Sequence, residues 1–205
     1  MGTFLMLSGI ANSSVTEVEN ALRDFATKHS GSLTPLSSDI ESGDVLLIAA
    51  SDQGNVTVLY PDSYLSWHEA CEHLSVTLKK PVLSLHIHDG DFWMYVLLKN
   101  GQEIDRFNPI PDYWEELPES EMKSWAGNAE VFARHWPNVT PSQISNYLVR
   151  WDMLNEENAK AYPDDEFGSG EDWQLTDFMA KVGLVYPIDD NGRSLGSKYN
   201  FEVES

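Results

Sequence analysis

Two histidines and two aspartates stand close together in the segment Leu85-His86-Ile87-His88-Asp89-Gly90-Asp91. Side chains alternate along a β-strand, so His86 and His88 are expected on one face of a strand. Two imidazoles on one face, with a carboxylate such as Asp91 or a water beside them, can bind a divalent metal. The alternative is structural: Asp89-Gly90-Asp91 is a turn, and the histidines lie on the polar face of a half-exposed strand. We predict no cofactor; His86 and His88 are the candidate ligands if a metal binds.

A second segment, Trp67 to His73, places a thiol among imidazoles and carboxylates. A thiol near an imidazole can act as an activated nucleophile. However, Cys71 falls on the apolar stripe of the expected helix, and no third orienting group can be assigned. We therefore expect Cys71 to be buried, unpaired and slow to react with thiol reagents.

A third segment joins an isolated arginine, Arg106, to a proline-rich stretch that contains Tyr113 and Trp114. A guanidinium beside aromatic rings can clamp a carboxylate or a phosphate. The alternative is that Arg106 pairs with a neighbouring acid and that the prolines form a fixed connection. The candidate ligand-binding residues from the first and third segments are His86, His88, Asp91, Arg106 and Tyr113.

The chain is strongly acidic, with 33 acidic residues against 13 basic ones and a net charge of -20. Phosphates would be repelled, which argues against nucleic-acid binding. Residues 102–205 carry 21 acidic and 8 basic residues, against 12 and 5 in residues 1–101. Such charge can steer a basic protein partner, although it can also serve only to keep a loop solvated. The candidate partner-binding residues are Glu156, Glu157, Asp164, Asp165 and Glu166.

Motifs that would indicate a catalytic or membrane protein are missing from the sequence. There is no Gly-rich phosphate loop, G-x-S-x-G elbow, HExxH pair or dinucleotide fingerprint. No stretch reaches 18 apolar residues, so no membrane span is expected. Residues 4–7 are apolar, but no basic residue precedes them, so a strand is predicted there and not a secretory signal. With a lone cysteine, this favours the cytoplasm.

Helices and strands alternate in the first half of the chain. Gly54 and Gly101, 47 residues apart, mark two hairpin turns. The surrounding strands and helices align at nearly the same offset, which suggests two similar blocks of order αβββ. Helices are expected at about 13–30 and 63–79, and strands at 32–36, 45–50, 55–60, 82–88, 92–98 and 102–107.

The predicted fold is therefore α+β. Residues 1–108 are expected to form the two αβββ blocks, an antiparallel sheet platform with helices on one side. Residues 109–205 are expected to form an acidic, mainly helical C-terminal region packed on it, as one compact unit. The tail after Asp189 shows no pattern, and its last residues are expected to be poorly ordered.

Two functions follow from these features. The first is a cytoplasmic, non-enzymatic binding protein, immunity- or inhibitor-like, that turns an acidic surface toward a basic partner. The alternative is a small-ligand or metal-dependent enzyme that uses the His86/His88 strand face. The sequence indicates no oligomeric state.

Overall fold

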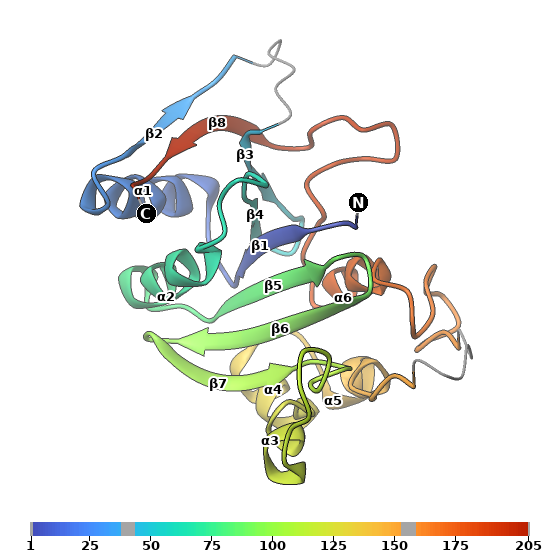
Figure 1. The fold of residues 1–205 in the computed structure, drawn as a ribbon. Coiled ribbons are helices and arrows are strands. Elements are labelled where there is room, and N and C mark those ends of the chain that lie inside the picture. The colour runs from blue at the N-terminus through green and yellow to red at the C-terminus, as the bar shows by residue number, and fades with distance from the viewer. Residues whose placement is uncertain (1, 38–43, 153–158, 205) are drawn as a thin grey trace.

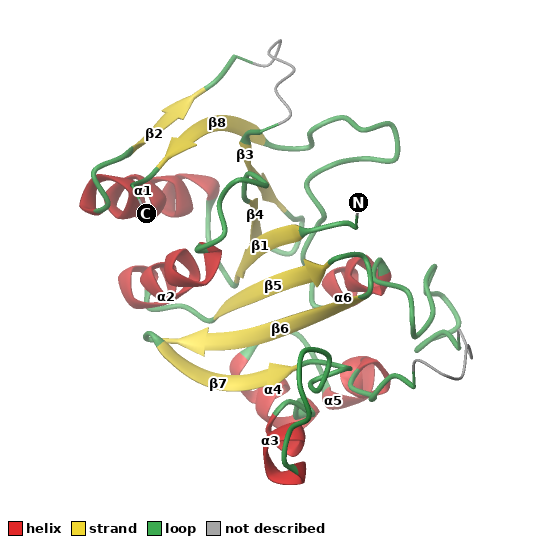
Figure 2. Cartoon of the chain, viewed as in Figure 1, coloured by secondary structure: helices red, strands yellow, loops and turns green. Residues whose placement is uncertain are grey.

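An antiparallel sheet runs through the computed structural model, which describes residues 2–37, 44–152 and 159–204 (Figures 1 and 2). Its strands are β1 (Leu5–Ile10), β2 (Ser32–Pro35), β3 (Leu46–Ala50), β4 (Val56–Leu59), β5 (Val82–His88), β6 (Phe92–Lys99), β7 (Gln102–Phe107) and β8 (Ser197–Glu202). The eight strands lie in the order β2-β8-β3-β4-β1-β5-β6-β7. The mixed α+β class expected from the sequence is confirmed.

Some of the helices begin at capping side chains that the sequence supplies. They are α1 (Val15–Lys28), α2 (Trp67–Leu78), α3 (Glu119–Ser124), α4 (Ala129–His135), α5 (Pro141–Ile144), the 3₁₀ turn η1 (Ser145–Tyr147) and α6 (Gln174–Lys181). Ser14 and Glu17 form a reciprocal capping box at the start of α1. The Asn128 side chain accepts hydrogen bonds from two backbone N–H groups at the start of α4.

Helices cover both faces of the sheet, not one as expected. In Figure 1, α1 and α2 lie on one side of the sheet, and α4, α5 and α6 lie on the other. The reason is the pattern of the central strands. Leu83, Leu85 and Ile87 of β5 are fully buried on one face, and Val82 and His86 are buried on the other. A strand that is apolar on both faces needs a layer on each side.

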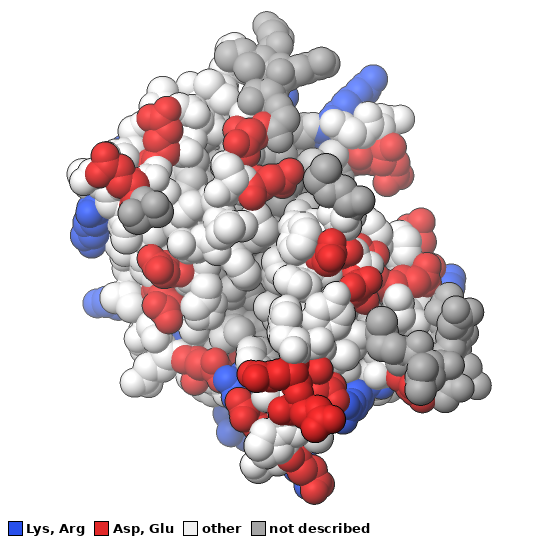
Figure 3. Space-filling model, viewed as in Figure 1, with Lys and Arg blue, Asp and Glu red and all other residues white. Residues whose placement is uncertain are grey.

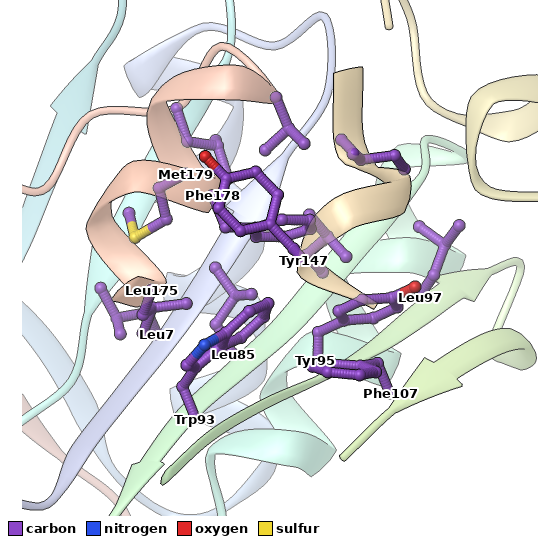
Figure 4. Packing of buried hydrophobic residues seen from close by; sticks show 14 of the residues in the cluster. Leu7, Leu85, Trp93, Tyr95, Leu97, Phe107, Tyr147, Leu175, Phe178 and Met179 are labelled. Atoms are coloured by element: carbon purple, nitrogen blue, oxygen red, sulfur yellow. The ribbon is translucent and has the colours of Figure 1, made fainter. Parts of the chain in front are cut away.

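The core beneath the C-terminal layer is rich in aromatic side chains (Figure 4). Trp93 and Tyr95 of β6 project into it, and Phe178 of α6 lies against both rings, at 4.9 and 5.5 Å between centroids. The indole N–H of Trp93 donates to Gln174, so this buried polar atom is satisfied. Phe132 of α4 packs edge-on against Tyr95 and Phe178. The C-terminal layer is thus bound to the sheet through one shared core.

Two equivalent αβββ blocks are not confirmed. Strands β5, β6 and β7 are contiguous, but β8 lies between β2 and β3 and pairs with both. The turns also differ, since Asn100 and Gly101 form a two-residue turn, whereas Gly54 closes a longer one between Ser51 and Asn55. The constant spacing of the glycines therefore reflects two unlike hairpins.

The C-terminal region has less helix than its residue pattern suggested. Between β7 and Trp125, helix is limited to the six residues of α3, which begins at Glu119, directly after Pro118. The tail, expected to lack order, instead supplies β8, where Tyr199 and Phe201 are buried. This strand is recognised by its alternation of Tyr and Phe with polar residues, which is a weak signal over six residues.

Candidate functional site

The end of β5 brings together the two histidines that the sequence singled out. His86 is 5% exposed, and its ring stacks on Trp67 of α2 at 4.6 Å between centroids. Its Nδ1 lies 2.9 Å from the carbonyl oxygen of Leu5. A carbonyl only accepts, so Nδ1 carries the proton, and Nε2 must accept from Nδ1 of His88 at 3.2 Å. Both tautomers are therefore fixed by the surrounding hydrogen bonds.

This arrangement favours a neutral His86. Burial lowers the pKa of His86 to about 4, and the neighbouring His88 acts in the same direction. Nε2 of His86 and Nδ1 of His88 face each other and share one hydrogen bond, so an ion bound by both nitrogens would have to replace the proton between them. In the part of the chain that the structure describes, no group of three or more His, Cys, Asp or Glu is arranged to hold a metal.

Aromatic rings surround His88 on its solvent side. The ring of Trp114 meets it edge-on at 4.9 Å, Tyr113 at 5.6 Å, and Phe4 at 5.2 Å. Phe92, fully buried, forms the base of the group. Trp114 is 57% exposed and Phe4 is 40% exposed, although both are large apolar side chains. Exposed aromatics of this size are typical of binding surfaces when they occur together.

The β5–β6 turn places two carboxylates beside these rings. Asp89 and Gly90 both have positive φ and begin the three-residue turn that joins His88 of β5 to its paired residue Phe92 of β6. Asp91 is the last residue of this turn and accepts a hydrogen bond from the Tyr113 hydroxyl. This bond raises the pKa of Tyr113, and the charges of Asp91 and Asp89 add to the shift. The hydrogen bond ties the loop after β7 to the β5–β6 turn.

Further acids border the same place. Glu115 and Glu116 are exposed and follow Trp114 directly. Among the described residues, Asp89, Asp91, Glu115 and Glu116 form no ion pair with Lys or Arg. Figure 3 shows acidic side chains gathered over the region of the loop after β7 and of α3. We refer to Phe4, His88, Tyr113 and Trp114, with Asp89, Asp91, Glu115 and Glu116, as the aromatic–acidic surface.

Another carboxylate, on Asp172, lies near the β5–β6 turn. Its Oδ2 is buried and has no hydrogen-bond partner among the described residues. Burial raises the pKa of Asp172, and the charges of Glu171 and Asp91 act in the same direction. The backbone that precedes β1 also lies here, since Gly90 donates to the Thr3 carbonyl. The acidic character of the surface therefore extends behind the turn.

Arg106 is held by its own neighbourhood. Its guanidinium donates to the Ser124 carbonyl and hydroxyl, lies 4.2 Å above the Trp125 ring, and is 3.5 Å from Glu103. None of these contacts involves His86, His88 or Tyr113. The structure thus brings together four of the five candidate ligand-binding residues and leaves Arg106 outside the group.

The expected partner-binding carboxylates have mainly structural contacts. Asp165 is 4% exposed and accepts from the Tyr147 hydroxyl and the Tyr162 backbone. Asp164 is exposed but paired with Lys181 at 2.8 Å. The expectation of a solvated Asp164-Asp165-Glu166 run is therefore wrong for Asp165, because its buried carboxylate accepts from a buried hydroxyl and from a partly buried backbone N–H. Glu156 and Glu157 lie outside the described residues.

Cys71 has the burial that its helical position predicted. It is free, fully buried, and 2.9 Å from the Ser8 hydroxyl. Burial raises the pKa of its thiol to about 12.

A serine, a histidine and a glutamate also lie in contact near Cys71. His68 is 3.1 Å from the Ser84 hydroxyl and 3.6 Å from Glu72, and hydrolases use the same three residue types as a catalytic triad. Ser84 is only 4% exposed, so its hydroxyl is not presented to a substrate.

No family model, curated protein or solved structure matches this chain. No described helix combines the length and the apolar character that crossing a membrane requires. The site must therefore be interpreted from its own geometry. Sequence reasoning missed Phe4 and Trp114 as site residues; the available signal was the pair of adjacent aromatics, Tyr113-Trp114, followed by two glutamates.

Proposed function

We propose that this protein is a non-enzymatic binding protein that recognises a basic protein partner through the aromatic–acidic surface. The observation that carries the proposal is Trp114, which is 57% exposed and contacted edge-on by His88 and Tyr113. It lies beside carboxylates that form no ion pair with a lysine or arginine among the described residues. An immunity- or inhibitor-like role, in which the protein covers a basic site on its target, fits this chemistry. The proposal places the protein in the cytoplasm, where a lone reduced thiol such as Cys71 is stable.

The aromatic part of the surface would supply the affinity. Tryptophan and tyrosine dominate binding hot spots because they bury large areas at low entropic cost. A guanidinium or ammonium over an indole face gains a cation–π interaction of roughly 0.5–2 kcal/mol, the larger values applying after desolvation. An arginine or lysine side chain of the partner can therefore lie on Trp114 with its charge toward the nearby carboxylates.

The carboxylates would increase the rate of association with a basic partner and make that rate depend on salt. Exposed charges steer encounter and are screened within about 8–10 Å at physiological ionic strength. Asp89, Asp91, Glu115 and Glu116 have no internal Lys or Arg partner among the described residues, so a basic partner would not have to displace one. Asp164, by contrast, is already neutralised by Lys181. This difference favours the aromatic–acidic surface over the acidic loop.

A peptide titration tests where cationic side chains bind. The probe is an arginine–glycine repeat peptide, followed by backbone amide shifts in NMR spectra, with a glutamine–glycine repeat as the neutral control. We expect the largest shifts at Phe4, His88, Tyr113 and Trp114, and a loss of affinity of about tenfold or more between roughly 20 and 150 mM salt.

Charge variants separate this surface from general acidity. Asp89→Asn with Glu115→Gln removes two carboxylates from the surface, and Asp190→Asn with Glu204→Gln removes two exposed carboxylates elsewhere. Both pairs change the net charge equally. The first pair should weaken peptide binding severalfold more than the second. Equal weakening would show that the peptide senses only net charge and would contradict the proposal.

A further inference from the structure

A pocket lies beside the segment between β7 and α3, which also carries Trp114. It is formed by the end of β7, that loop, α3 and the segment after η1, and its volume is about 290 Å³. Phe107, Pro111, Met122 and Leu148 give it mainly apolar walls. This volume and lining are at the lower end of the range for small-molecule sites.

One polar group in the pocket lacks a protein partner. Asn108 lines the pocket and is only 4% exposed. Its Oδ1 accepts from the backbone N–H of Ile110 at 2.8 Å, which fixes the orientation of the amide. Within the described residues, the side-chain nitrogen of Asn108 donates no hydrogen bond. This nitrogen is not among the fully buried, unpartnered side-chain atoms of the described residues, so it keeps some exposure at a residue that lines the pocket. A buried donor of this kind favours a ligand that offers an acceptor.

The charged groups at the rim are already paired. Lys123 lies 2.6 Å from Glu119, and Arg150 lies 2.5 Å from Asp112. An anionic ligand would therefore have to compete with a carboxylate for each cation. It would also meet the field of a chain whose net charge is -20. These features favour an uncharged ligand.

We propose that this pocket binds a small, uncharged, largely apolar molecule whose carbonyl oxygen accepts a hydrogen bond from the Asn108 side-chain amide. The apolar body would lie against Phe107, Met122 and Leu148. This site uses none of the residues of the aromatic–acidic surface. A test of ligand binding in the pocket is therefore independent of a test of partner binding at the aromatic–acidic surface.

Three probes that share a phenyl group test the ligand class. Phenylacetamide has a neutral carbonyl, phenylacetate carries a charge, and toluene has no acceptor. In NMR titrations of the full chain, phenylacetamide should shift the Asn108 side-chain amide signals with a dissociation constant of about 1 mM, a typical value for ten non-hydrogen atoms. Phenylacetate and toluene should each bind at least fivefold more weakly. Absence of saturation by phenylacetamide, or equal binding of phenylacetate or toluene, would overturn the proposal.

Two substitutions in the pocket test its location. Asn108→Asp keeps the oxygen that accepts from Ile110 and removes the amide donor, so phenylacetamide should bind at least tenfold more weakly at pH 7.5. Ala126→Leu adds volume at the pocket wall and should weaken binding at least fivefold, whereas Ser120→Leu, on the exposed surface of α3, should leave it unchanged. A folded Ala126→Leu protein with unchanged affinity would place phenylacetamide elsewhere and contradict the proposal.

Discussion

His88 donates a hydrogen bond from Nδ1 to Nε2 of His86 over 3.2 Å, beneath the exposed ring of Trp114. The bond requires His86 to be neutral, because a protonated ring would present a second N–H to the His88 donor. Through His88, the buried ring of His86 is therefore linked to the exposed ring of Trp114. Its protonation should affect both stability and the local surface.

Acid should destabilise the protein partly through His86. Burial lowers its pKa to about 4 from 6.5, so between these pH values the unfolded chain takes up a proton that the folded chain does not. The free energy of unfolding should therefore fall by up to about 3 kcal/mol as pH falls through this window. Urea denaturation at pH 7 and pH 4.5 measures this change.

A His86→Gln variant serves as the control for that experiment. It lacks the titrating ring but keeps the carboxylates that also titrate in acid. Its unfolding free energy should depend on pH less steeply than that of the unsubstituted protein. Parallel pH curves for the two proteins would mean that His86 titrates normally in the folded state.

Cys71 should react slowly in the native protein. A pKa near 12 leaves roughly a thousandfold less thiolate at neutral pH than an ordinary cysteine has. Labelling with a thiol reagent at pH 7.5 should be at least 100-fold slower than in denaturant. A cysteine introduced by Ser120→Cys, on an exposed position of α3, should label quickly in the same sample. Comparable rates at the two thiols would show that Cys71 is accessible.

Asp165 and Asp164 should differ in their contributions to stability. Asp165→Asn disturbs a buried carboxylate that accepts from Tyr147 and Tyr162, and should lower the free energy of unfolding by about 1–3 kcal/mol. Asp164→Asn removes an exposed ion pair and should cost at most about 1 kcal/mol. Chemical denaturation distinguishes them. Equal, small effects would restore the interpretation of this run as a solvated loop.

Truncation of an aromatic residue should lower the free energy of unfolding much more in the core than on the surface. Phe178→Ala opens a cavity between α6 and β6 and should cost about 3–5 kcal/mol of stability. Trp114→Ala removes a ring that is 57% exposed and should cost less than about 1 kcal/mol. Thermal or urea unfolding measures both. A large loss from Trp114→Ala would identify that side chain as part of the folding core.

Local patterns in the sequence were sufficient to predict most strands of the sheet. The strands from Val82 to Lys99 are mostly apolar, and Asp-Gly and Asn-Gly pairs mark the turns that follow β5 and β6; such signals are local. The position of β8 between β2 and β3 was not predictable in this way. It depends on pairing between residues more than 150 positions apart, such as Leu33 with Phe201.

The site was predictable in part for the same reason. His86 and His88 share a strand face because of simple alternation, which the sequence shows. That Trp67 covers one ring and Trp114 the other depends on where α2 and the loop after β7 pack. The burial of Asp165 likewise depends on two tyrosines that the chain brings to it. From its residue type alone, Asp165 was expected to be exposed to solvent.

The affinity of Trp114→Ala for the arginine–glycine peptide tests the central claim most directly. Leu65→Ala is the matched control, because Leu65 is also a large apolar residue and is 72% exposed. Measured at low salt by calorimetry, Trp114→Ala should weaken binding at least tenfold, and Leu65→Ala less than twofold. Unchanged affinity in a folded Trp114→Ala protein would contradict the assignment of the aromatic–acidic surface as the binding site.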